Sequence, residues 1–203
     1  MKLISINSGK VGPLFASQHP DHTVVMSGIK KSGISDINQP GPVKINSLGV
    51  IGDEQADLTV HGGIEKAIYV YPHEHYSFWN ALLSRELKKP MDLQPGAMGE
   101  NFTITGLFEE NVFVGDTLQI GHLEFVVTKL REPCFKFNAR MGYKGAAKAM
   151  LQSGYCGWYM GVITPGTLIA GSAINHRPGR QKTAIADQVR SIAKRDMQRD
   201  LWG

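Results

Sequence analysis

Apolar and polar residues alternate in several short stretches of this chain, which is the pattern of half-buried β-strands. Two such stretches, residues 116–120 and 123–127, flank the pair Gly121-His122. A Gly-X pair between two alternating runs is typical of a two-residue β-hairpin. The sequence therefore predicts an antiparallel hairpin here, closed by a type II′ turn.

Similar strand signals recur along the rest of the chain. One strand is predicted at the N-terminus and another over residues 66–71. Residues 158–163 form a further predicted strand, and the turn at residues 164–167 should let residues 168–170 pair back on it. Frequent strands separated by turns indicate a mainly β fold, built as a closed or nearly closed antiparallel barrel.

Helical periodicity interrupts the strands at three places. Pro72 fits the first turn of a helix that places four apolar residues on one face, namely Tyr76, Trp79, Leu82 and Leu83. A second helix is predicted over residues 143–151, with Gly154 near its end. Thr183 can cap a third helix, whose apolar stripe consists of Ile185, Val189, Ile192, Ala193 and Met197.

The chain divides unevenly into two parts. Residues 175–182 are polar and contain Pro178-Gly179, which predicts a linker. We therefore expect one β-barrel domain over residues 1–174, with inserted helices, and a linker with a C-terminal helical extension over residues 175–203. A single helix cannot bury its apolar stripe alone, so it should dock on the barrel or on a second subunit, as in a homodimer.

Composition excludes several classes of protein. Residues 1–174 contain fifteen Lys and Arg and fifteen Asp and Glu, so their charges cancel. Residues 175–203 contain seven Lys and Arg but only three Asp and Glu, so the net charge of +4 arises entirely there. This excess fits a solvated helix face better than a nucleic-acid surface, because aromatic and basic residues do not interleave there. No apolar run reaches membrane-spanning length, and no signal peptide is recognisable. With two cysteines and no sign of a disulfide, a cytoplasmic location without membrane contact is expected.

The most informative chemical group is the thiol of Cys134, which follows Pro133 and lies between Arg131 and Lys136. A thiol beside fixed positive charge is biased toward the thiolate, which attacks electrophiles and binds soft metals. Pro133 restricts the backbone, so the loop should be stiff. The alternative is a buried structural cysteine. Together, one activated thiol and converging cations suggest a phosphorylated, metal-bearing cofactor, the cations being Lys31, Lys66, Arg131 and Lys136.

Two glycine-rich polar blocks complete the candidate chemistry. Residues 49–67 contain His61 followed by two glycines, and residues 96–103 contain Glu100-Asn101 after Gly99. Glycine permits sharp bends and close approach to a ligand, although turns and solvated loops have the same composition. The sequence lacks phosphate-loop, dinucleotide-binding and serine-hydrolase motifs, and it lacks four ligands for an iron–sulfur cluster.

These blocks closely resemble the MOSC domain family, which is named after the C-terminal domain of molybdenum-cofactor sulfurases. The resemblance rests on residues 52–57 with 61–67, 99–101 and 131–136, and it extends over residues 27–171. Within the family the chain is similar to the bacterial YiiM-type subgroup. That subgroup adds a small C-terminal helical region and is linked to detoxifying N-hydroxylated bases such as 6-hydroxylaminopurine.

The resemblance implies a MOSC-type β-barrel, similar to the pyruvate-kinase barrel, with its site at one mouth. It also implies a pterin molybdenum cofactor (molybdopterin) whose metal is bound by the thiolate of Cys134. The implied cofactor-binding residues include cations that contact the cofactor phosphate or support the metal ligands, and polar residues that line the pocket. The full set is Lys31, His61, Lys66, Glu100, Asn101, Arg131, Lys136 and Asn138.

Two functions remain open at this stage. The first is a molybdenum-dependent reductase that converts small N-hydroxylated substrates to amines. It would receive electrons from a separate ferredoxin- or flavin-type protein, because the chain shows no cluster or flavin motif. The second is a carrier that holds sulfur as a persulfide, or the cofactor itself, on Cys134 without catalysis. The same thiolate would serve both functions.

Overall fold

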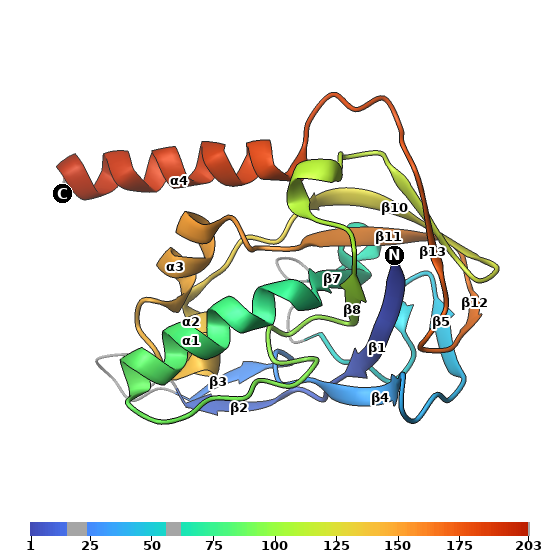
Figure 1. Ribbon diagram of the computed structural model, residues 1–203, viewed down its shortest axis with the longest axis horizontal. Helices are drawn as coiled ribbons and strands as arrows, with labels where there is room; N and C mark the ends of the chain where they lie inside the picture. The colour runs from blue at the N-terminus through green and yellow to red at the C-terminus, as the bar shows by residue number, and fades with distance from the viewer. Residues whose placement is uncertain (16–23, 56–61, 203) are drawn as a thin grey trace.

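The computed structural model describes residues 1–15, 24–55 and 62–202, so the predicted pocket residue His61 lies outside the described residues. Its centre is one strongly curled sheet of eight strands (Figure 1). In spatial order these are β13 (Ile174–Arg177), β9 (Thr117–Ile120), β10 (Leu123–Leu130), β11 (Trp158–Thr164), β7 (Ile68–Pro72), β8 (Phe102–Thr105), β1 (Lys2–Ser8) and β4 (Ser32–Asp36).

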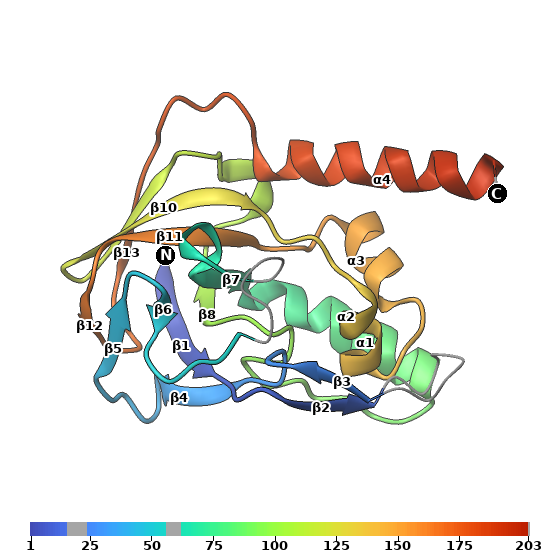
Figure 2. The same cartoon turned by 180° about the vertical axis from the view of Figure 1, so that it is seen from behind.

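The sheet curls until β1, next to the β4 end, meets the segment that leads into β13 at the other end, which confirms a mainly β, barrel-like fold. The N–H of Leu3 donates to the carbonyl of Ser172 at 3.0 Å, and the N–H of Gly171 donates to the carbonyl of Leu3 at 2.8 Å. These bonds join β1 to the segment that leads into β13 (Figure 2). The expectation of a purely antiparallel barrel is wrong for one pair: β7 and β8 are parallel, because a helical crossover connects them.

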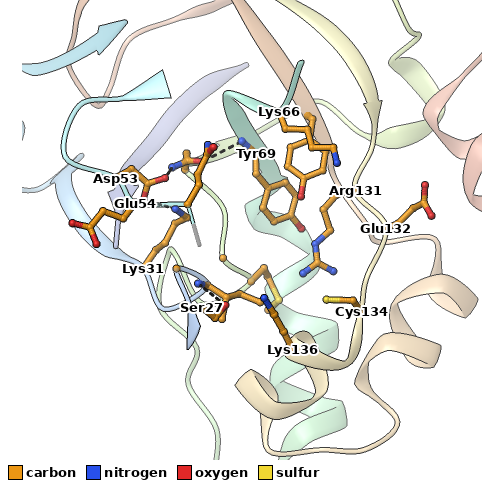
Figure 3. Close-up of a pocket in the computed structure, with 17 residues that line it drawn as sticks. Ser27, Lys31, Asp53, Glu54, Lys66, Tyr69, Arg131, Glu132, Cys134 and Lys136 are labelled. Carbon is orange, nitrogen blue, oxygen red and sulfur yellow. Dashed lines mark hydrogen bonds and ion pairs between the residues drawn. The ribbon is translucent and has the colours of Figure 1, made fainter. Parts of the chain in front are cut away.

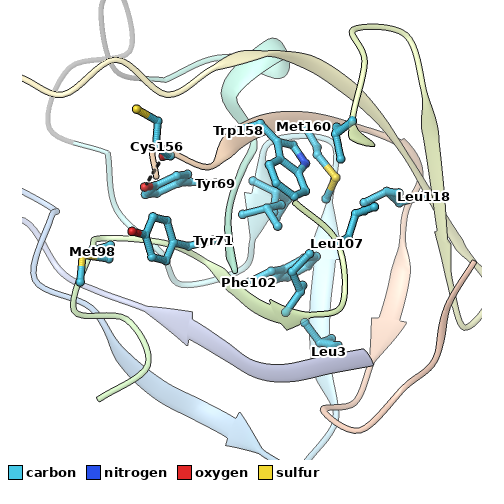
Figure 4. Packing of buried hydrophobic residues seen from close by; sticks show 14 of the residues in the cluster. Leu3, Tyr69, Tyr71, Met98, Phe102, Leu107, Leu118, Cys156, Trp158 and Met160 are labelled. Carbon is cyan, nitrogen blue, oxygen red and sulfur yellow. Dashed lines mark hydrogen bonds between the residues drawn. The ribbon is translucent and has the colours of Figure 1, made fainter. Parts of the chain in front are cut away.

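The predicted hairpin of β9 and β10 is confirmed. Ile120 pairs with Leu123, and Gly121 has a φ of 60°, as the first central residue of a type II′ turn requires. Along β10, Leu123, Phe125 and Val127 are buried and alternate with partly exposed residues. The buried side chains fill the barrel together with residues of other strands such as Leu3, Phe102 and Trp158 (Figure 4). The rings of Phe102 and Phe125 meet edge to face, with their centres 5.5 Å apart.

Two small sheets flank the barrel. One contains β12 (Gly166–Leu168), β5 (Val43–Asn46) and β6 (Gly49–Val50), and the other contains β2 (Gly12–Phe15) and β3 (Val24–Ser27). The predicted pairing of residues 168–170 with β11 is therefore wrong. Both edges of β11 are already occupied, one by β10 and the other by β7, so β12 pairs with β5 instead.

The first two predicted helices are present. Helix α1 (Tyr76–Leu87) buries Trp79 and Leu83, but Pro72 ends β7, and a short turn, η2 (His73–His75), comes before the helix. Helix α3 (Ala146–Ser153) ends at Gly154, which adopts a φ of 80°. Helix α2 (Phe135–Met141) was not predicted, because Pro133 led us to expect a loop around Cys134. Two further turns are η1 (Ile64–Lys66) and η3 (Glu109–Asn111).

The C-terminal region differs from the expected linker and helix. Residues 174–177 form strand β13, so the barrel continues past the predicted boundary. The imidazole of His176 fixes this strand through the carboxylate of Asp116, at 2.7 Å. Helix α4 (Ile185–Trp202) begins two residues after Thr183 and docks on the barrel by burying Ile185 and Val189, then extends past α3 (Figures 1 and 2). In the described part of the chain, no helix has the length and apolar composition needed to cross a membrane.

Candidate functional site

One pocket brings together residues from distant parts of the chain. Six of the residues singled out by sequence line it, namely Lys31, Lys66, Asn101, Arg131, Cys134 and Lys136. The sulfur of Cys134 and the guanidinium of Arg131 lie on one side, and the ion pair of Lys31 with Asp53 lies on the other (Figure 3). A ligand in this pocket would therefore lie between a thiol and a buried ion pair.

The two cysteines occupy very different environments. Cys134 stands directly before α2, is partly exposed and lines the pocket, while its carbonyl accepts the N–H of Phe137 at 2.8 Å. Cys156 is fully buried, and its thiol contacts the carbonyl of Met150 at 3.4 Å. Burial raises the pKa of Cys156 to about 12, so that thiol stays protonated. Cys134 is consequently the thiol that can meet a ligand, and it is not the buried structural cysteine of the alternative interpretation.

Arg131 places a buried positive charge beside this thiol. Its side chain lies between two aromatic rings, 4.7 Å from the centre of Phe137 and 5.4 Å from that of Tyr69. Burial acts to lower the pKa of Arg131, but the neighbouring phenols and thiols outweigh it, so the pKa is raised and the guanidinium stays charged. Among the described residues no carboxylate lies within ion-pair distance of it. A buried cation without a counter-ion favours an anionic group in the pocket.

The opposite side of the pocket is organised by Asp53, which lies in the block 52–57 but was not among the predicted site residues. One carboxylate oxygen accepts the N–H of Gly9 at 2.8 Å and forms an ion pair with Lys31. The other oxygen accepts the side-chain amide of Asn101 at 2.9 Å. The side chains of Lys31 and Asp53 are only 7% and 5% exposed. Burial lowers the pKa of Lys31, although the attraction of Asp53 opposes this effect.

Asn101 lines the pocket, and its side-chain amide bonds to protein groups through both its oxygen and its nitrogen. Its oxygen accepts the N–H of Tyr69 at 3.2 Å, and its nitrogen donates to the carbonyl of Asn7 at 3.3 Å as well as to Asp53. Backbone bonds hold the residue further, because its N–H donates to the carbonyl of Tyr69 at 2.8 Å. Asn101 therefore fixes Asp53 in position, and both N–H donors of its amide are already used by protein groups.

Two predicted cofactor-binding residues lie outside the pocket lining. Glu100 is fully buried, because the glycine-rich turn before it directs its carboxylate inward. The carboxylate accepts backbone N–H groups of that turn and two hydroxyls, the partners being Gly96, Met98, Tyr76 and Thr103. Asn138 lies on α2 and accepts the N–H of Ala147 at 2.7 Å, which joins α2 to α3. Both residues hold the walls of the pocket in place without lining it.

Sequence reasoning also missed the aromatic part of the pocket, formed by Tyr69 and Tyr159. Their rings are tilted by 46° with centres 5.5 Å apart, and the hydroxyl of Tyr69 is anchored on the carbonyl of Cys156 at 2.8 Å. The two residues are direct partners on neighbouring strands β7 and β11. Each tyrosine belongs to a predicted strand. Their contact could be predicted only by knowing that these two strands pair, and the sequence did not reveal that pairing.

A family model of the MOSC domain matches residues 57–175, more than half of the chain, so the chain belongs to the MOSC domain family. MOSC domains are associated in general with molybdenum-cofactor binding. The matched segment begins after Lys31 and Asp53, so an important part of the pocket comes from outside it.

Individual relatives agree with this assignment. Protein YiiM of Escherichia coli is 38% identical over 142 residues, which are 70% of this chain and 62% of YiiM. YflK of Bacillus subtilis is 42% identical over 121 residues, 60% of this chain and 52% of YflK. A protein named reductase from Gibberella moniliformis is 34% identical over 179 residues, 87% of this chain but 31% of its own length. The chain thus spans less than two thirds of these curated relatives.

The fold agrees with solved structures as well. The crystal structure of YiiM from Geobacillus stearothermophilus superposes with a TM-score of 0.70 at 27% identity, covering 95% of this chain and 83% of that protein. YiiM from Escherichia coli gives a TM-score of 0.66 at 24% identity, which supports the fold alone. The YiiM-like β-barrel expected from sequence is therefore confirmed.

Proposed function

We propose that this protein binds the molybdenum cofactor through Cys134 and reduces small N-hydroxylated compounds to amines. The observation that carries the proposal is the accessible thiol of Cys134 beside Arg131, a buried cation that has no carboxylate partner among the described residues. The MOSC membership, the YiiM relatives and the relative named reductase support it.

The donor set of the pocket fits this cofactor. A thiolate is a soft ligand suited to a thiophilic metal, and the buried guanidinium of Arg131 suits a neighbouring anionic group. Lys66 and Lys136 line the same pocket and can neutralise a phosphate. When bound, the cofactor supplies the two electrons that cleave the N–O bond. The protein's own part is to hold the ligands, to orient the substrate and to provide protons.

The reaction has a simple balance: R–NH–OH, two electrons and two protons give R–NH₂ and water. The electrons would come from a separate ferredoxin- or flavin-type protein. The paired rings of Tyr69 and Tyr159 give the pocket an aromatic wall, which suits a planar substrate such as 6-hydroxylaminopurine. Its reduction yields adenine.

Metal analysis of two matched variants tests the cofactor site. The full chain, Cys134→Ser and Cys156→Ser would be produced in a molybdenum-competent host and analysed by mass spectrometry. We expect stoichiometric molybdenum in the wild type and in Cys156→Ser, whose side chain is buried, and its loss in Cys134→Ser, because a hydroxyl is a poor ligand for a soft metal.

Turnover is then measured with the loaded wild type, reduced viologen as the artificial donor and 6-hydroxylaminopurine as the substrate, with adenine quantified by chromatography. Loaded protein that reduces no N-hydroxylated compound would contradict the reductase. A persulfide on Cys134 in protein that never takes up molybdenum would favour the sulfur carrier instead.

A further inference from the structure

The proposed reduction consumes two protons, and the pocket must hold a group that can release one near the leaving oxygen. This inference rests on the proposed function. Arg131 keeps its proton at every accessible pH. Burial raises the pKa of both phenols in the wall, Tyr69 and Tyr159, so they hold their protons. Cys134 is the proposed metal ligand, and Lys66 and Lys136 are the proposed phosphate contacts, so we expect the donor on the side of the pocket opposite to Cys134.

That opposite side carries the buried ion pair of Lys31 with Asp53. Asp53 is immobilised by the N–H of Gly9 at 2.8 Å and the amide of Asn101 at 2.9 Å. Asn101 in turn is held by the backbone of Tyr69. An ammonium has three N–H donors, so Lys31 can bind Asp53 and still direct a donor into the pocket that it lines.

We propose that Lys31, held by Asp53, is the proton donor to the oxygen that leaves the substrate as water. As the N–O bond breaks, this oxygen takes one proton from the Lys31 ammonium, which becomes a neutral amine. The substrate nitrogen takes the second proton from solvent. The Lys31 amine then regains its proton from solvent through the open side of the pocket, next to the Asp53 carboxylate that favours the charged form.

The environment of Lys31 suits this role. Burial lowers the pKa of Lys31, which brings an ammonium closer to the range where it can transfer a proton, while Asp53 and, more weakly, Glu100 keep it charged. The other charged groups that line the pocket are Glu54, Lys66, Arg131, Glu132 and Lys136. A proton donor must be protonated to act, so turnover should fall as the pH rises through the pKa of Lys31.

The first test compares Lys31→Arg with Lys10→Arg. Arginine can keep the ion pair with Asp53 but cannot release a proton. Lys10 is a matched control, because it pairs with Glu54, next in sequence to Asp53, yet its side chain is 72% exposed. We expect Lys31→Arg to load molybdenum and keep its KM while kcat falls about a hundredfold or more. Lys10→Arg should behave as the wild type.

The second test uses pH. In Asp53→Asn the attraction that keeps Lys31 charged is lost while its burial remains, so the alkaline fall in kcat should move to a pH about 1–3 units lower. Independently of turnover, NMR of protein labelled with ¹³C-lysine should show one lysine titrating below the usual value for lysine. That signal should disappear in Lys31→Arg and move further down in Asp53→Asn.

The outcomes separate the two proposals. Wild type that neither binds molybdenum nor reduces the substrate overturns the proposed function. Active wild type with an equally active Lys31→Arg and an unchanged pH profile overturns only the role of Lys31. If Lys31→Arg does not load the cofactor, the role of Lys31 is judged from the NMR titration and from the pH profile of Asp53→Asn. A Lys31 signal that titrates like an ordinary lysine overturns the inference.

Discussion

Glu100 illustrates how a carboxylate next to a pocket can serve the fold rather than the chemistry. It accepts hydrogen bonds from two backbone N–H groups and from the hydroxyls of Tyr76 and Thr103, and it is fully buried. These bonds fix the turn that ends at Gly99, part of the pocket wall. Burial raises the pKa of Glu100 even though the hydrogen bonds act in the opposite direction.

This raised pKa leads to a prediction about stability. Between the ordinary pKa of a glutamate and its raised value, the folded chain binds more protons than the unfolded chain, so the contribution of Glu100 is lost as the pH rises through this interval. Glu100→Gln cannot titrate. The unfolding free energy of the wild type, measured by urea denaturation over a series of pH values, should therefore fall relative to Glu100→Gln as the pH rises.

Glu110→Gln, at an exposed carboxylate, is the control for loss of one negative charge. A Glu100→Gln protein with the stability profile of the wild type but without bound molybdenum would contradict this interpretation. That result would place Glu100 in contact with the cofactor, as the sequence had suggested.

At the residue scale, the sequence pointed to residues of one pocket where neighbours in the chain carry the information. Cys134 stands out because Arg131 and Lys136 lie close to it in the chain, and the structure places all three in one pocket. Asp53 could not be recognised in this way, because its partners Gly9, Lys31 and Asn101 lie in other segments. Only folding brings these groups together.

At the scale of elements, α4 supports the segment that carries the thiol. The side-chain oxygen of Gln188 accepts the N–H of Leu130 at 2.9 Å, directly before Arg131. Ile185 and Val189 are 0% and 3% exposed on the barrel side of the helix. Ile185 and Val189 belong to the apolar stripe that the sequence predicted. In the structure, the start of the helix packs this stripe against the chain's own barrel.

A pair of substitutions on α4 measures this docking. Ile185→Ala should lower the unfolding free energy by about 2–5 kcal/mol, because a buried side chain is removed and a cavity remains. Arg190→Ala, at an exposed ion pair with Asp187, should cost less than about 0.5 kcal/mol. Thermal denaturation reports both values, with a shift of about 2–4 °C per kcal/mol for a chain of this size. Equal effects of the two substitutions would show that the helix does not pack as described.

At the scale of the whole molecule, the N-terminal residues complete both the barrel and the pocket. Strand β1 lies between β8 and β4 and bonds to the segment before β13, and its Leu3 and Ile6 are fully buried. The MOSC match begins only at residue 57, after β1, Lys31 and Asp53. The folding unit is thus larger than the segment in which the family is recognised.

This arrangement predicts that the matched segment cannot fold alone. Residues 57–175 produced as a separate chain would lose β1, β4 and part of β13, and would expose the apolar interior of the barrel to water. We expect no cooperative unfolding transition by calorimetry, whereas the 203-residue chain should show one. A cooperative transition of the short segment at a similar temperature would contradict this view of the barrel.

The sequence by itself determined several of the elements and pointed to the thiol that lines the pocket, because both are encoded in short-range spacing. Alternation specified strands such as β9 and β10, helical periodicity specified α1 and α3, and neighbouring cations marked Cys134. Blocks in fixed order were enough to indicate the family.

Only the tertiary structure decided which edges pair and which polar groups face the pocket. The parallel contact of β7 with β8, the pairing of β12 with β5 and the continuation of the barrel into β13 depend on which strand edges are still free once the sheet has curled. The engagement of Asn101, the burial of Glu100 and the ion pair of Lys31 with Asp53 depend on contacts between segments far apart in the chain. Local patterns carry no information about such contacts, because their free energy arises only when the distant groups meet.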